Sequence, residues 1–263
     1  MYQFNYHQPT SLAEAREIFS NAEDPAYLSG GQTLIATLKQ RLASPSDLID
    51  LSGIAEMSGI EVSRTSVIIG GFVRHSDVAN SAEIKAAIPA LAHLAGLIGD
   101  AQVRNRGTIG GSVANSDPAA DYPAAVVALK ATVYTDQRLI PGNEFFSDLF
   151  ETALEPGELV RCIEFSVPTR CAYSKFPNPA SRYAVVGVMV ADFDGDIQVG
   201  VTGAGACASR HSELEAALNK DLSSEACEGV AIDFSDFNTD LHASAEYRGQ
   251  LVKVMAKRAV AAL

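Results

Sequence analysis

The sequence has no tryptophan, no long apolar run and no sign of an export signal. Its longest uninterrupted apolar stretches, such as residues 184–191, reach about eight residues, whereas a transmembrane helix needs roughly 18 or more. The N-terminal segment MYQFNYHQPT has neither the basic start nor the apolar core of a secretory signal. We therefore expect no integral membrane segment and no export.

Cysteine is scarce, and its spacing is uninformative. The four residues, Cys162, Cys171, Cys207 and Cys227, are widely scattered and form no CxxC pair. This spacing excludes the usual zinc and iron–sulfur motifs, so we expect no metal site in this chain. Unpaired thiols are typical of a reducing compartment, which predicts a cytoplasmic protein.

Basic residues are outnumbered by acidic ones. Lys and Arg total 20 against 32 Asp and Glu, a net charge of −12. Such a surface repels nucleic acid and anionic membranes and leaves small molecules and other proteins as partners. With 263 residues, 47% of them apolar, the chain has ample material for a globular core, and two domains are the default count.

The first 55 residues alternate between strand and helix patterns. Residues 26–28 and 47–51 are typical of strands. Between them, Leu34, Leu38 and Leu42 recur at helical spacing, which predicts one helix that ends before a Ser–Pro pair. A Gly–Gly turn precedes this helix, so the turn is expected at a helix N-terminus.

The rest of the chain changes character near residue 170. The predicted elements are a hairpin at 60–73, helices at 76–99 (broken at Pro89), 124–129, 211–219 and 244–262, and strands at 131–135, 159–167, 185–193 and 196–204. We expect a first domain over 1–170, with subdomains of about 1–55 and 56–170, and a second domain over 171–263.

Two glycine clusters are the informative motifs, SGGQT (29–33) and TIGGS (108–112). Paired glycines let the backbone turn sharply and approach a ligand closely. A helix N-terminus presents unbonded N–H groups to a phosphate. Two such loops suit a pyrophosphate, and the lack of a Walker lysine argues against a nucleoside triphosphate with magnesium. Taken singly, each pair is more simply a plain turn.

The sequences around both loops resemble one family. YLSGGQTLIATLKQRLASPSDLIDL (27–51) and VRNRGTIGGSVANSDPAADYPAAVVAL (103–129) are similar to the two flavin loops of the FAD-binding medium subunit of molybdenum hydroxylases, of the xanthine dehydrogenase and aerobic carbon monoxide dehydrogenase type. The similarity continues through LVRCIEFSVP (159–168), YSKFPNPASRYAVVGVMVA (173–191) and HASAEYRGQLVKVMAKRAV (242–260). It therefore covers nearly the whole chain.

This resemblance implies a fold and a function. The fold is α+β: a two-subdomain FAD-binding domain of the vanillyl-alcohol-oxidase or p-cresol-methylhydroxylase type, followed by a smaller α+β domain with an antiparallel sheet. The function is electron transfer through noncovalent FAD, from two [2Fe-2S] clusters of a small partner subunit to an external acceptor. A large partner subunit would hold the molybdenum cofactor and oxidise the substrate, in a dimer of heterotrimers.

The resemblance also implies a set of FAD-binding residues and no catalytic acid or base. They are Ser29, Gly30, Gly31, Gln32, Thr33 and Leu34 in the first loop, Thr108, Ile109, Gly110, Gly111 and Ser112 in the second, and Asn115, Asp117, Asp121, Val160 and Lys175 elsewhere. Asp121 would accept a hydrogen bond from a hydroxyl of the ribityl chain or ribose. Lys175 would place a cation beside the flavin ring and raise its potential.

Several of these positions have simpler interpretations. Asn115 and Asp117 could form a turn, Val160 a core strand, and Lys175 a surface charge. His75 is interpreted as the neighbour of a helix capped by Ser76 or Asp77, with a cofactor contact as the alternative. The role of Tyr183, after two prolines, stays open.

Other functions remain to be weighed. The stretch 203–208 fits GxGxxA, but about 55 residues follow it, too few for a Rossmann fold, so close packing is the better interpretation. The alternatives to electron relay are a self-contained FAD-dependent reductase or oxidase and a scaffold that has lost its flavin. The sequence identifies neither the substrate nor the final acceptor.

Overall fold

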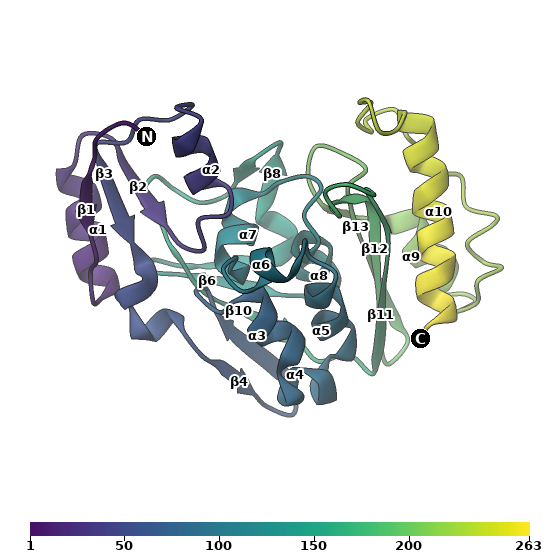
Figure 1. Cartoon of the computed structure of the whole chain (residues 1–263). Helices are drawn as coiled ribbons and strands as arrows, with labels where there is room; N and C mark the ends of the chain where they lie inside the picture. Colours follow the sequence, from purple (N-terminus) through teal and green to yellow (C-terminus); the bar gives the residue numbers. More distant parts are fainter.

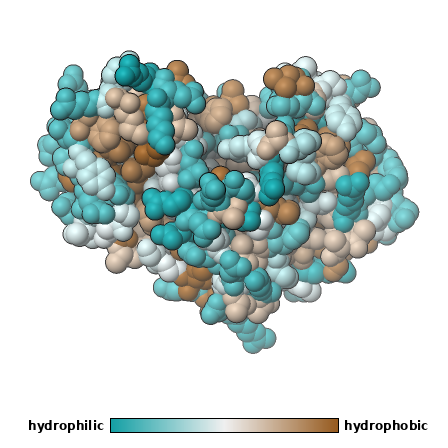
Figure 2. Space-filling view, in the orientation of Figure 1, coloured by the Kyte–Doolittle hydropathy of each residue, from teal (hydrophilic) through white to brown (hydrophobic).

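The computed structural model describes all 263 residues. The chain passes from a small N-terminal subdomain, through a central sheet with helices, to a C-terminal sheet backed by a long helix (Figure 1). The space-filling view shows the surface hollowed along its upper edge, between the N-terminal and C-terminal parts (Figure 2).

The N-terminal subdomain is a three-stranded parallel sheet with two helices. Its elements are β1 (Asn5–His7), α1 (Leu12–Asn21), β2 (Pro25–Leu28), α2 (Leu34–Lys39) and β3 (Asp47–Asp50). The strand order is β1-β3-β2. The central strand, β3, buries Leu48 and Ile49, as expected for a parallel strand with neighbours on both sides. The predicted strand–turn–helix–strand order is confirmed.

The second helix is shorter than its leucine spacing predicts. It ends at Lys39, and Arg41 adopts the left-handed backbone with φ +60°. Leu42 consequently lies outside the helix, and its side chain is 75% exposed. The inclusion of Leu42 in the helix was wrong because a regular spacing does not show where the backbone turns.

The central sheet has five strands, all paired antiparallel. Its strands are β4 (Ile60–Val62), β5 (Ser66–Gly70), β6 (Thr132–Thr135), β7 (Leu139–Pro141) and β10 (Val160–Ser166). They lie in the order β4-β5-β10-β6-β7. β4 and β5 form the predicted hairpin, and β10 pairs with β5 although about 90 residues separate them. A two-stranded ribbon, β8 (Phe146–Asp148) with β9 (Glu151–Thr152), lies apart.

Six short helices lie between β5 and β6. They are α3 (His75–Asn80), α4 (Ala82–Ala87), α5 (Pro89–Gly96), α6 (Ala101–Arg104), α7 (Ile109–Asn115) and α8 (Tyr122–Ala128). The predicted helical stretch 76–99 is thus three helices. Pro89 begins α5, and the Ser81 hydroxyl caps α4 by accepting from the Ile84 amide at 3.1 Å.

The C-terminal part is an antiparallel sheet of four strands with two helices. Its elements are β11 (Arg170–Pro177), β12 (Ala184–Phe193), β13 (Asp196–Thr202), β14 (Ser209–Arg210), α9 (Ser212–Leu218) and α10 (Ala245–Ala261). α10 packs on β11 and β12. The mixed α+β class and the antiparallel C-terminal sheet are confirmed.

The division into domains at residue 170 stays a prediction. The central sheet ends at Ser166 and the next sheet begins at Arg170. Tyr173, Met189 and Ala191 nevertheless pack into the core that the central helices share. The two parts are therefore joined by a common apolar interface.

Two further observations concern the helices and the GxGxxA stretch. None of the helices has both the length and the apolar content needed to cross a bilayer. Gly203, in the GxGxxA stretch, has φ +85°, and a Cβ there would lie 2.6 Å from the Val185 carbonyl oxygen. The stretch leads into β14 and serves close packing.

Candidate functional site

One cavity of about 640 Å³ is lined by residues from separate segments of the chain, between Tyr27 and Tyr183. Both glycine loops line it. The other lining segments include Glu158–Val160, at the start of β10, and Ser181–Tyr183, which directly precedes β12. Its size lies within the range of small-molecule sites. The predicted convergence of the two loops is therefore confirmed.

The two loops touch each other directly. The Ser29 hydroxyl lies 2.7 Å from the Thr108 hydroxyl. Gly30 packs against the backbone before the second loop, where a Cβ would lie 2.4 Å from the Arg106 carbonyl oxygen and 2.7 Å from Gly107 Cα. Any side chain at Gly30 would push the loops apart, so glycine is required there for loop contact.

The first loop carries a run of unpaired backbone donors. The amides from Gly30 to Leu34 donate to no protein acceptor, although their residues line the cavity. Gly31 has φ +70°, a conformation that glycine adopts without strain. Successive unpaired amides at such a turn form an anion-binding concavity. This arrangement fits a diphosphate.

The second loop works differently from the expectation. The Ile109 amide donates to the Val73 carbonyl at 3.0 Å and the Gly110 amide to Gly71 at 2.9 Å. The Gly111 amide donates to the Thr108 hydroxyl, the N-cap of α7, at 3.2 Å. The amides from Ile109 to Ser112 are thus already bonded, so the expectation that the glycines of this loop offer free N–H groups was wrong. It contributes close backbone approach and hydroxyl groups instead.

Nearly all the predicted site residues line this one cavity, with two exceptions. Those that line it are Ser29, Gly30, Gly31, Gln32, Thr33, Leu34, Thr108, Gly110, Gly111, Ser112, Asn115, Asp117, Asp121 and Val160. The exceptions are Ile109, which is fully buried in the central core, and Lys175. Lining the cavity is compatible with binding FAD, while the individual roles stay predictions.

Lys175 is neither a surface charge nor part of the cavity wall. Its side chain is 4% exposed, and its Nζ lies 2.9 and 3.0 Å from the two carboxylate oxygens of Asp121. The Tyr173 hydroxyl donates to the same carboxylate at 2.6 Å. Burial raises the pKa of Asp121, and the Lys175 charge and the Tyr173 hydrogen bond oppose that rise. Lys175 therefore reaches the cavity only through Asp121.

His75 is part of the cavity wall, and its interpretation as a helix neighbour was wrong. It is the first residue of α3, whose N-cap, Arg74, makes no side-chain cap. The ring is 4% exposed, and its Nδ1 has no hydrogen-bond partner. Burial, followed by the charge of Arg104, lowers the pKa of His75 to about 4. The imidazole is therefore neutral at physiological pH.

A cluster of apolar side chains that was not foreseen also lines the cavity. Its walls include Tyr27, Leu51, Met57 and Leu159. A flat aromatic ring of a cofactor fits such walls. No local pattern marks these residues, because they come from separate segments that only the fold brings together.

Polar side chains line the cavity as well. Among them are Asp117, Asp121, Arg182 and Tyr183. Arg182, at φ +64°, donates to the Gly99 carbonyl at 3.3 Å and so links the C-terminal part to the central helices. Burial raises the pKa of Asp117 and of Tyr183. The compact turn from Asn178 to Tyr183, closed by a 2.7 Å hydrogen bond, brings Tyr183 to the cavity.

The cavity geometry defines a class of site, one that fits a cofactor containing a diphosphate. A family model described as the FAD binding domain in molybdopterin dehydrogenase matches residues 2–169. The chain therefore belongs to this family of oxidoreductase subunits, and FAD is its cofactor.

Individual relatives match along their whole length. The glyceraldehyde dehydrogenase medium chain of Sulfolobus acidocaldarius is 33% identical, over 98% of this chain and 97% of the relative. The carbon monoxide dehydrogenase medium chain of Hydrogenophaga pseudoflava is 32% identical, over 98% and 96%. A solved structure of carbon monoxide dehydrogenase from Hydrogenophaga pseudoflava superposes with a TM-score of 0.90 at 33% identity, over 99% of this chain and 96% of that one.

Proposed function

We propose that this chain is the electron-transfer subunit of a heterotrimeric molybdenum hydroxylase. The supporting observation is the run of unpaired amides from Gly30 to Leu34 beside the second glycine loop. When bound, FAD would supply electron-transfer chemistry between the iron–sulfur partner and an external acceptor. The residues of this chain bind it, shield it and set the charge around it.

In this proposal the first loop holds the FAD diphosphate with its amides. The second loop packs against the first through Thr108 and Gly30 and adds the hydroxyls of Thr108 and Ser112. Asp121 is oriented by Lys175 and Tyr173. It accepts a hydrogen bond from a hydroxyl of the ribityl chain or ribose. His75, neutral and buried, offers a hydrogen bond without adding charge.

The partners proposed are a large subunit with the molybdenum cofactor and a small subunit with two [2Fe-2S] clusters. Support comes from the relatives, several of which are named as medium chains. The complex would be a dimer of heterotrimers, in the cytoplasm, where the four free cysteines stay reduced.

The test is purification of the full chain, alone and co-expressed with its neighbouring genes. The chain alone should be yellow and release FAD, not FMN, on heating. The co-expressed complex should contain molybdenum, iron and FAD, and light scattering should give the mass of two heterotrimers. A flavin-free chain that binds no added FAD would contradict the proposal. Turnover of NAD(P)H with an organic substrate by the chain alone would favour a self-contained reductase.

A further inference from the structure

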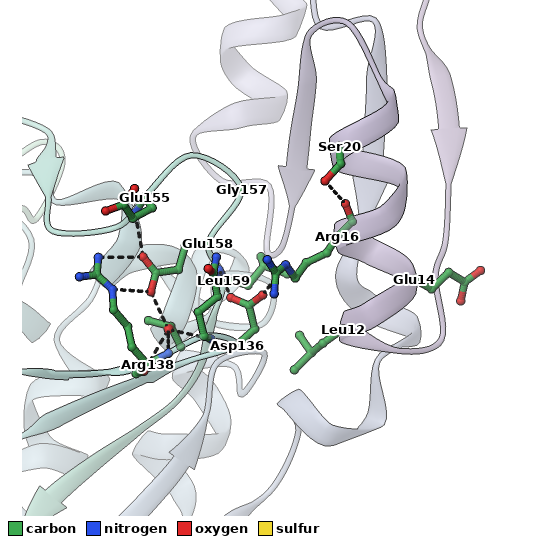
Figure 3. A network of polar contacts seen from close by, with 12 residues as sticks. Leu12, Glu14, Arg16, Ser20, Asp136, Arg138, Glu155, Gly157, Glu158 and Leu159 are labelled. Atoms are coloured by element: carbon green, nitrogen blue, oxygen red, sulfur yellow. Dashed lines mark hydrogen bonds and ion pairs between the residues drawn. The ribbon is translucent and has the colours of Figure 1, made fainter.

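A buried carboxylate, Asp136, connects a segment of the cavity wall to the N-terminal subdomain. Asp136 lies in the turn between β6 and β7, and its side chain is 2% exposed. Its Oδ1 accepts from the Leu159 amide at 2.8 Å, and its own amide donates to the Leu159 carbonyl at 3.0 Å. Its Oδ2 lies 3.1 Å from Nε of Arg16, which reaches across from α1 (Figure 3).

The segment that Asp136 holds is a wall of the cavity. Glu158, Leu159 and Val160 line it. Leu159 is 5% exposed and packs in the apolar core of the N-terminal subdomain. Just before it, the Gly157 carbonyl accepts from the Tyr27 hydroxyl at 3.2 Å. Along the chain this wall leads into β10 of the central sheet. These contacts, however, are with the N-terminal subdomain.

The same segment is anchored on its other side by Glu158. This side chain is fully buried and accepts from Arg138 through two hydrogen bonds of 3.0 Å. It also accepts from the Thr135 hydroxyl at 2.6 Å and the Glu155 amide at 2.7 Å (Figure 3). A buried carboxylate with all these partners resists displacement. The wall is rigid on the side of the central sheet, so its placement against the first loop depends on its contacts with the N-terminal subdomain. These contacts are the Arg16–Asp136 pair, the Tyr27 hydrogen bond and the packing of Leu159.

The Arg16–Asp136 pair holds a special place among the ion pairs of the structure. It is the only one that joins residues 1–55 to the rest of the chain. The first glycine loop lies on the Arg16 side and the wall Glu158–Val160 on the Asp136 side. The pair therefore helps to set the distance between the first glycine loop and the wall Glu158–Val160, which line the same cavity.

We infer that Asp136, paired with Arg16, is a positioning residue for FAD. It fixes the wall at the distance from the first loop that the cofactor requires. The inference rests on the proposed role of this cavity in FAD binding. Without the Arg16 charge, a smaller fraction of the molecules would have the wall and the loop at the separation that FAD requires. FAD binding would have to restore that separation, which lowers its apparent affinity. FAD would then leave faster than the loss of folding stability alone predicts.

The chain supplies a control ion pair of similar distance and exposure. It differs in one respect, because Arg170 also donates a hydrogen bond to Asp192, whereas Asp136 Oδ2 accepts none. In the C-terminal sheet, Arg170 Nε lies 3.0 Å from Asp192 Oδ2, with side chains 50% and 7% exposed. The corresponding values for Arg16 and Asp136 are 3.1 Å, 47% and 2%. Neither Arg170 nor Asp192 lines the cavity. Arg16→Gln and Arg170→Gln thus remove equivalent charges, one beside the cavity and one away from it.

The experiment measures FAD release and folding stability separately. The full chain is loaded with FAD, diluted, and followed by the rise in flavin fluorescence, and urea midpoints are taken on the FAD-free chain. We expect Arg16→Gln and Asp136→Asn to release FAD about tenfold faster, equivalent to about 1.4 kcal/mol. Arg170→Gln should release it at the parent rate with a similar change in urea midpoint. Arg16→Lys should restore part of the retention.

The outcomes separate the inference from the function it rests on. Parent-like FAD release from Arg16→Gln and Asp136→Asn would overturn the inference while leaving the cavity as the FAD site. Equal acceleration in Arg16→Gln and Arg170→Gln would overturn it too, because general destabilisation would then suffice. A parent chain that binds no FAD would overturn both.

Discussion

Replacing Gly30 by alanine should separate the two glycine loops. The added Cβ would lie 2.4 Å from the Arg106 carbonyl oxygen, whereas ordinary contact begins near 3.4 Å, so the loops must move apart by about 1 Å. That shift would stretch the 2.7 Å Ser29–Thr108 hydrogen bond beyond bonding distance. Overpacking costs about 1–3 kcal/mol and the hydrogen bond about 0.5–1.5 kcal/mol.

The assay compares two glycines. Gly30→Ala should lower the free energy of unfolding by about 2–4 kcal/mol and weaken FAD binding at least tenfold in a fluorescence titration. Gly96→Ala is the control, because a Cβ at the end of α5 meets nothing within 4 Å. It should leave FAD affinity unchanged and stability equal or slightly higher. Parent-like stability and FAD affinity in Gly30→Ala would refute the reasoning.

Three further predictions follow from buried polar groups. Thr108→Val removes the cap on the Gly111 amide and should lower the unfolding free energy by about 1–2 kcal/mol in urea titrations; an unchanged midpoint would contradict this. His75 has a folded pKa of about 4, below its ordinary 6.5, so the unfolded chain binds more protons between these values. Above pH 6.5 the imidazole is neutral in both states, so His75 does not lower the free energy of unfolding. As the pH drops toward 4, the free energy of unfolding falls by up to about 3 kcal/mol, because only the unfolded chain takes up the proton. His75→Gln should flatten that part of the pH–stability curve, and an equally steep curve would speak against a neutral buried imidazole. Lys175→Met leaves the Asp121 carboxylate buried without its cation and should cost about 3–5 kcal/mol; a loss below 1 kcal/mol would show that Asp121 has other compensation.

The local features of the site were readable from the sequence. Gly30 and Gly31 predict a turn at a helix start. Gly31 adopts a left-handed backbone that few other residues tolerate, and Gly30 lies where a Cβ would not fit. The helix after them was placed correctly at its start, since start signals are local. Its end was not, because the left-handed turn at Arg41 leaves no mark in the spacing of leucines.

Other features depend on contacts between distant segments. The second-loop amides look free in sequence, but the carbonyls of Gly71 and Val73 accept from them. Lys175 looks like a surface charge or a flavin contact, and only the fold buries it against Asp121. The Arg16–Asp136 pair joins residues 120 positions apart, and no local pattern indicates it.

A crystal structure of the FAD-loaded chain would show where the diphosphate binds. We predict that it lies within hydrogen-bonding distance of the backbone amides between Gly30 and Leu34, with the second glycine loop on its other side. A diphosphate bound away from those amides, with the two loops in contact as described, would contradict it.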